Sequence, residues 1–101
     1  MAGVGKLLKQ AQKMQRGIAE VQQRLGEERL DFSHGGGAIK VTVNGHGLVV
    51  ALVIDPDFLK EEKSIVETAL VAALQDSTVK AKERYDAEMS KVTAGFSLPG
   101  L

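Results

Sequence analysis

The sequence predicts an α+β fold in which two long helices flank a small antiparallel sheet, in the order α-β-β-β-α. Three observations predict it: an apolar stripe at helical spacing near the N-terminus, an alternating segment followed by a turn signal, and a second helical stretch after a proline. The chain has 101 residues, and 44% of them are hydrophobic. That length and composition suit a single packed domain, which we expect to cover residues 1–101.

The first predicted helix spans residues 6–25. Its apolar residues follow one another at steps of three and four positions, which keeps them on one face of a helix. This spacing is typical of a coiled-coil seam. The apolar stripe consists of Leu7, Ala11, Met14, Ile18, Val21 and Leu25.

The predicted sheet covers residues 29–54. Residues 39–43 alternate between apolar and polar side chains, as a half-buried strand does. Asn44-Gly45 is a strong hairpin signal, and we expect it to form a type I′ turn with positive φ angles. Leu48 to Ile54 is apolar on both faces, so we expect this strand to be central or covered on both sides.

After the sheet, residues 56–60 are expected to form one helical turn. Ser64 and Glu67 form a capping-box pattern that opens a second helix over residues 64–93, and residues 94–101 form a short tail. A helix of this length is about 45 Å long, whereas a compact domain of this size has a radius of gyration of about 13 Å. The second helix must therefore extend beyond the sheet.

Three predicted surfaces of this small chain are apolar and would be exposed to solvent in a monomer. They are the stripe on the first helix, the overhanging part of the second helix, and the strand that is apolar on both faces. Exposed apolar stripes are uncommon on soluble monomers. We therefore expect the protein to form a homodimer.

The sequence offers no catalytic or metal-binding set. It contains no cysteine, and its two histidines, His34 and His46, lie in glycine-containing turns without metal-ligand spacing. No nucleophile elbow or phosphate loop is present. We expect no enzyme activity, no cofactor, no metal and no small-molecule substrate, and a structural or solvent-exposed role for both histidines.

No segment is expected to span a membrane. The longest apolar run, Leu48 to Ile54, is far shorter than the roughly 20 residues that a membrane-spanning helix needs. Lysines interrupt the apolar positions near the N-terminus, so this region has no signal-peptide core. We therefore expect a cytoplasmic location.

The net charge of zero hides an uneven distribution. Residues 1–25 hold five cations and one anion, a net charge of +4, and the remainder of the chain carries −4. Four of the cations follow one another at steps of three or four positions, away from the apolar stripe. Such a row can follow nucleic-acid phosphates, and it is also what the solvated face of an ordinary helix looks like. We call it the basic ridge: Lys6, Lys9, Lys13 and Arg16.

Taken together, these segments resemble the YbaB/EbfC family of nucleoid-associated DNA-binding proteins. The resemblance runs from about Lys6 to Leu101, and its parts occur in the order typical of the family. They are residues 7–15 (LLKQAQKMQ), 39–45 (IKVTVNG), 53–56 (VIDP) and 95–99 (GFSLP). One departure is that Leu48 to Ile54 is more apolar than we expect of the family, which suggests a tighter dimer or an additional partner.

The resemblance implies a tweezer-like homodimer that binds double-stranded DNA in the bacterial nucleoid, with a role in nucleoid organisation and gene expression and without catalysis. It places the DNA contacts on the projecting helices. Two other functions remain open: a non-catalytic protein–protein adaptor that uses its helical faces, and an RNA-binding factor. The candidate DNA-binding residues are Lys6, Lys9, Lys13 and Arg16, with Lys80, Lys82 and Arg84 as secondary candidates.

Overall fold

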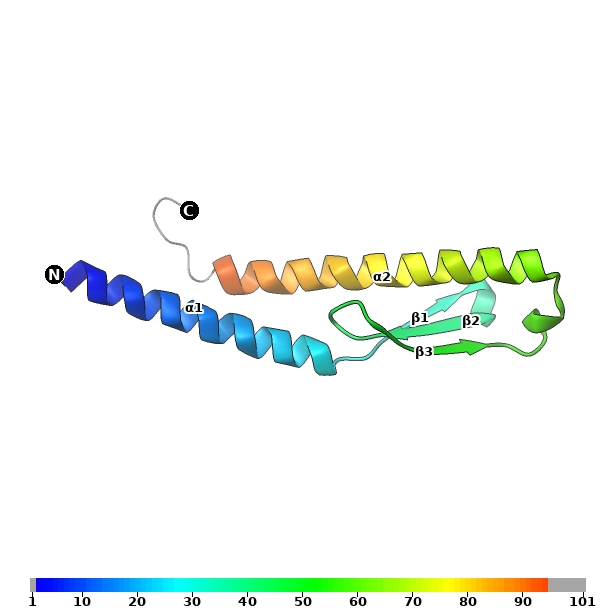
Figure 1. Ribbon diagram of the computed structural model, residues 1–101, viewed down its shortest axis with the longest axis horizontal. Helices are drawn as coiled ribbons and strands as arrows, with labels where there is room; N and C mark the ends of the chain where they lie inside the picture. The colour runs from blue at the N-terminus through cyan, green and yellow to red at the C-terminus, as the bar shows by residue number, and fades with distance from the viewer. Residues whose placement is uncertain (1, 95–101) are drawn as a thin grey trace.

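The computed structural model describes residues 2–94, which form an elongated molecule of 71 × 23 × 17 Å (Figure 1). The chain folds in the predicted α-β-β-β-α order, and the predicted helical turn after the sheet is present. The elements are α1 (Ala2–Glu27), β1 (Leu30–His34), η1 (Gly35–Gly37), β2 (Ile39–Val43), β3 (Val49–Ile54), η2 (Phe58–Lys60) and α2 (Lys63–Ala94).

Both helices extend slightly beyond their predicted ends. α1 begins at Ala2, four residues before the predicted start, and ends at Glu27. α2 continues to Ala94, so the predicted tail is shortened to residues 95–101, which lie outside the described residues.

The predicted capping box at the start of α2 is wrong. The carbonyl oxygen of Glu62 accepts hydrogen bonds from the N–H groups of Ile65 (3.0 Å) and Val66 (3.1 Å). Glu62 therefore occupies the N-cap position, where the first helical carbonyl lies. Ser64 lies inside the first turn and cannot act as the cap that its spacing to Glu67 suggested.

The core lies between α2 and two strands of the sheet. The strand order is β1-β2-β3, and both pairs are antiparallel. The side chains of Ile39, Val41 and Val43 alternate along β2 and are at most 2% exposed. They pack against small residues of α2, Ala73 and Ala81.

β3 lies at the edge of the sheet, so the prediction of a central or covered strand is wrong within one chain. Residues 49–53 are all exposed. The reason is the width of the helix that covers the sheet. An α-helix with its side chains is about 10–12 Å wide and strands lie about 4.8 Å apart, so one helix covers about two strands. α2 lies over β1 and β2, and β3 is left uncovered.

The β2–β3 hairpin is present as predicted, but its turn is not type I′. The positive φ angle belongs to Gly47 (84°) and not to Asn44 or Gly45. The N–H group of Gly47 donates to the carbonyl of Asn44 (3.0 Å), which gives a turn closed by a left-handed glycine. The side-chain oxygen of Asn44 accepts hydrogen bonds from the N–H groups of His46 and Leu48.

Gly45 is needed for a contact between the hairpin and α1. Its N–H group donates to the carbonyl oxygen of Leu25 (2.7 Å), and Leu25 is fully buried there. A Cβ atom at position 45 would lie 2.5 Å from that oxygen and 2.7 Å from the Leu25 Cβ. The C-terminal end of α1 is thus held by a close approach that only glycine allows.

Both histidines make structural contacts, one of the two roles expected for them, but His34 ends strand β1 and does not lie in a turn as predicted. His46 Nε2 lies 2.8 Å from the carbonyl oxygen of Gln22, and because a carbonyl can only accept, this nitrogen carries the proton. The His46 ring also packs against Tyr85, with ring centroids 5.7 Å apart. In β1, His34 Nε2 lies 2.9 Å from the hydroxyl of Ser77, which is buried on α2.

Four charged side chains join α1 to α2 in a closed ring. Arg24 contacts Glu28 (3.0 Å) and Glu88 (3.1 Å), and Arg84 contacts the same two carboxylates (2.8 and 3.6 Å). The hydrogen bond from Arg24 is the main reason that the pKa of Glu88 is lowered, and Lys91 lowers it further. The ring fixes the base of α1 against the C-terminal half of α2.

Replacing Gly45 by alanine should destabilise the fold by roughly 1–3 kcal/mol, because the new methyl group overlaps the backbone of Leu25. The measurement is the free energy of urea unfolding followed by circular dichroism. Gly5→Ala is the matched control, since nothing lies within 4 Å of a Cβ at that position in α1. The control should be neutral or stabilising by up to about 1 kcal/mol. Equal stabilities for the two variants would contradict the contact.

Acid should weaken the junction through Glu88. A lowered pKa in the folded state means that this carboxylate stabilises the fold at pH values above its ordinary pKa of 4.5, and that the contribution is lost as the pH falls through the lowered value. The unfolding free energy of the wild type should therefore fall more steeply in acid than that of Glu88→Gln. Glu83→Gln, on the exposed side of α2, should keep the wild-type pH profile. Identical profiles for Glu88→Gln and the wild type would show that the ionisation of Glu88 contributes nothing to stability.

Candidate nucleic-acid interface

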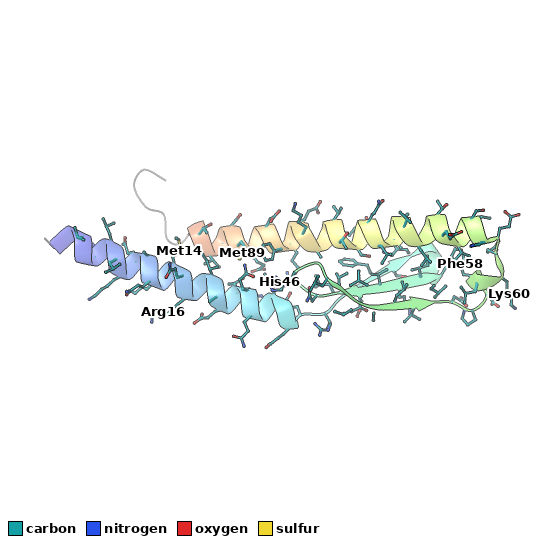
Figure 2. All side chains as sticks on the ribbon, in the orientation of Figure 1. Met14, Arg16, His46, Phe58, Lys60 and Met89 are labelled. Atoms are coloured by element: carbon teal, nitrogen blue, oxygen red, sulfur yellow. The ribbon has the colours of Figure 1, made fainter. Side chains whose placement is uncertain are left out.

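The basic ridge lies on the part of α1 that projects beyond the end of α2 (Figure 1). All four of its side chains, from Lys6 to Arg16, are exposed. Figure 2 shows Arg16 on the side of α1 that faces away from α2, and Met14 on the side that faces it. The structure thus brings the four ridge residues together on one outward face, as their spacing predicts.

The ridge has the length and the electrostatic character of a phosphate-binding surface. From Lys6 to Arg16 it spans about 15 Å at 1.5 Å per residue. Since a DNA strand advances about 3.4 Å per nucleotide, this corresponds to about four or five base pairs. Among residues 2–94, no ridge side chain has an ion-pair partner within 4.0 Å. The four charges are therefore available to an external polyanion.

The apolar stripe of α1 is covered only in its C-terminal half. Leu25 is fully buried beside the hairpin, and Met14 and Ile18 are half-buried. Leu7 and Leu8 are 50% and 59% exposed, because α1 continues past the end of α2 there. The projecting half of α1 therefore carries the basic ridge on one side and uncovered apolar side chains on another.

The secondary candidates on α2 lie apart from the ridge. Lys80 pairs with Asp76 (2.9 Å), and its ammonium group lies 5.7 Å from the centroid of the Phe32 ring. Lys82 is exposed and lines a shallow groove beside His46 and Tyr85.

Arg84 belongs to the charged ring described above. Its guanidinium group makes hydrogen bonds to both carboxylate oxygens of Glu28, and this pairing raises the pKa of Arg84. Glu28, the residue that follows α1, is twelve residues from Arg16, which is about 18 Å at the rise of a helix. Arg84 thus positions α1, and it is not part of the exposed row of cations.

Arg24, Glu28 and Glu88 were not identified from the sequence as residues that position the candidate site. Two contacts of the ring join residues that are 64 and 56 positions apart, so no local pattern reveals them. A partial signal was present, because Arg24 with Glu28 and Arg84 with Glu88 are each spaced i,i+4. The sequence shows the two i,i+4 pairs separately, and only the folded chain joins them into one ring.

Two further observations concern the described part of the chain. No helix in it is both long and apolar enough to cross a membrane. Among residues 2–94 there is also no cluster of three or more side chains that could ligate a metal ion.

Comparison with known proteins agrees with this fold. A nucleoid-associated protein of Pelotomaculum thermopropionicum is 33% identical over 99 residues, which cover 97% of this chain and 94% of the relative. The crystal structure of an uncharacterized protein from Helicobacter pylori has a TM-score of 0.70 and 25% sequence identity, over 86% of this chain and 89% of that one.

Residues 1–96 match the YbaB/EbfC DNA-binding family, the family that the sequence segments resemble. The match covers both helices and all three strands of the structure. The chain belongs to the YbaB/EbfC DNA-binding family.

Proposed function

We propose that this protein is nucleoid-associated and binds double-stranded DNA as a homodimer through the basic ridge. The observation that carries the proposal is the row of four exposed cations, without ion-pair partners among the described residues, on the projecting half of α1. Membership of a DNA-binding family supports DNA as the partner. The name of the Pelotomaculum relative supports a place in the nucleoid.

The chemistry of the ridge favours binding with little sequence preference. Lysine contacts phosphate as a point charge, and phosphate contacts fix the protein on the duplex without reading its bases. Glutamines beside the ridge, such as Gln12, can reach base edges, but the ridge itself is three lysines and one arginine. The net charge of −4 on the remainder of the chain confines DNA to α1.

A dimer makes this small ridge effective. One chain offers four ridge cations, and two chains offer eight on a single particle. Once the first ridge is bound, the second binds as an intramolecular event at high effective concentration. Modest contacts by each ridge then combine into a useful affinity.

Reversing the charge of Lys9 and Lys13 to glutamate should reduce duplex affinity by a factor of roughly 100 or more, because it removes phosphate contacts and adds repulsion. Gel shift with a duplex of mixed sequence measures the affinity, and light scattering checks the mass of the protein. The matched control is Lys60→Glu with Lys63→Glu, which makes the same change in net charge. Figure 2 places Lys60 at the end of the molecule opposite to α1. An equal loss in the control would show that net charge, and not the ridge, determines binding.

Salt should weaken binding in a predictable way. With about six phosphates neutralised per dimer, the logarithm of the affinity should fall against the logarithm of salt concentration with a slope of roughly −5. Lys9→Ala with Lys13→Ala removes up to four contacts per dimer, so the slope should change to about −2. A salt-independent affinity would contradict the phosphate mechanism.

The two other functions give different results in the same assay. Structured RNA that competes as well as duplex DNA would support an RNA-binding factor. A stable protein complex that survives nuclease digestion would support an adaptor. The DNA proposal requires duplex DNA to be the stronger competitor.

A further inference from the structure

The N-terminal part of α1 is a helix with almost no support from the rest of the protein. Within residues 2–94, the hydrogen bonds and ion pairs that join α1 to other elements begin at Gln22 and end at Glu28, the residue that follows the helix. Every residue in the range 3–9 is exposed, and the apolar side chain of Val4 is 60% exposed. This part of α1 is therefore held together mainly by its own backbone hydrogen bonds.

The sequence of the projecting half, residues 2–16, is poorly suited to such an unsupported helix. A glycine in a helix interior lowers the helix–coil equilibrium constant about fivefold relative to alanine. Gly5 lies within this half, and Gly17 lies between it and the anchored end of α1. The first turn also lacks an acidic residue that would interact favourably with the helix dipole. Without packing, helices shorter than about 12–15 residues are marginal in water.

The basic ridge adds repulsion to this marginal helix. Its cations follow one another at i,i+3 or i,i+4 spacing from Lys6 to Arg16, so they form three neighbouring pairs of like charge on the helix surface. Each such pair disfavours the helix about twofold. No ridge cation has an ion-pair partner among residues 2–94 that would relieve the repulsion. The helix that assembles the ridge is thus the state in which its charges repel one another most.

A chain of phosphates reverses this balance. The helical state aligns the four cations over about 15 Å, whereas an unfolded segment spreads them. Phosphates beside the aligned cations replace their mutual repulsion with attraction. A ligand that binds the helical state more tightly shifts the population toward it. The apparent affinity is then the intrinsic affinity reduced by the fraction of helix in the free protein.

We infer that helix formation in residues 2–16 is coupled to the binding of a phosphate chain. In the free protein this half exchanges between helix and coil, and the bound polyanion holds it in the helical state that Figure 1 shows. The inference rests on the proposed function, in which the phosphate chain is duplex DNA. It makes Gly5, which carries no charge and no side chain, a residue that limits the affinity.

The first test is amide hydrogen exchange measured by mass spectrometry on the full chain. In the free protein, residues 2–16 should exchange roughly 100-fold faster than residues 18–27, because only the second segment is anchored. Saturating duplex DNA should slow exchange in residues 2–16 about tenfold or more, since binding removes the coil state. Exchange in residues 64–79 of α2 serves as the control and should not change. A parallel measurement uses long-chain inorganic polyphosphate in place of DNA.

The second test changes helix propensity without changing charge. A Cβ atom at Gly3 or Gly5 has nothing within 4 Å, so Gly3→Ala with Gly5→Ala alters only the preference for the helix. This variant should bind duplex DNA about threefold tighter or more in gel shift, and Ala11→Gly should bind about threefold weaker or more. The matched control is Ala72→Gly, the same replacement at an exposed position of α2, which should leave the affinity unchanged.

The outcomes separate this inference from the proposed function. Equal exchange in residues 2–16 and 18–27 of the free protein would overturn the coupling and leave DNA binding intact. A duplex complex in which residues 2–16 exchange as fast as in the free protein would do the same, as would unchanged affinities of the alanine and glycine variants. If the wild type binds no duplex DNA, the proposed function fails. The coupling then stands if polyphosphate slows the exchange of residues 2–16, and it fails if polyphosphate does not.

Discussion

The width of α2 limits how much of the sheet one chain can bury. A single helix covers about two strands, and here it covers β1 and β2. The side chains of β2 are consequently sealed against Ala73 and Ala81, whereas β3 keeps its apolar side chains on the outside. Residues 2–94 form two long helices, one of which projects as an arm, and within these residues no further element covers that strand.

The same two helices create a second constraint, at the base of the arm. The C-terminal half of α2 extends past the sheet and meets α1, and three different interactions hold them there. Leu25 is buried against the hairpin at Gly45, Tyr85 contacts both Gln22 and His46, and the ring of four charges joins the helices on their exposed sides. Each of these three interactions uses a residue between 22 and 28, at the C-terminal end of α1 and just after it. The arm is therefore anchored at its base, and its basic half extends beyond the support.

The sequence predicted what depends on local periodicity. The order of the elements, the two long helices, the hairpin and the spacing of the basic ridge all follow from patterns within a few turns or strand positions. The exposure of β3 at the sheet edge did not follow from such patterns, because it depends on which strands α2 covers. The turn type did not follow from local patterns either. Gly45 is required by its close contact with Leu25, twenty residues away, and the positive φ angle of the turn belongs to Gly47. For the candidate site, the spacing of the cations was enough to identify the ridge. It could not show that Arg84 is excluded from the exposed cations, because Arg84 pairs with Glu28, 56 positions away, only in the folded chain.

The arm projects along the longest dimension of the molecule, the 71 Å axis, and this direction has a geometric consequence for a dimer. A two-fold axis parallel to the long axis sets the two arms side by side, where they can clamp one duplex between them. A two-fold axis perpendicular to it sends the arms to opposite ends, where they can bridge two separate duplex segments. In the homodimer proposed above, the direction of the two-fold axis would therefore decide between holding one stretch of DNA and joining two.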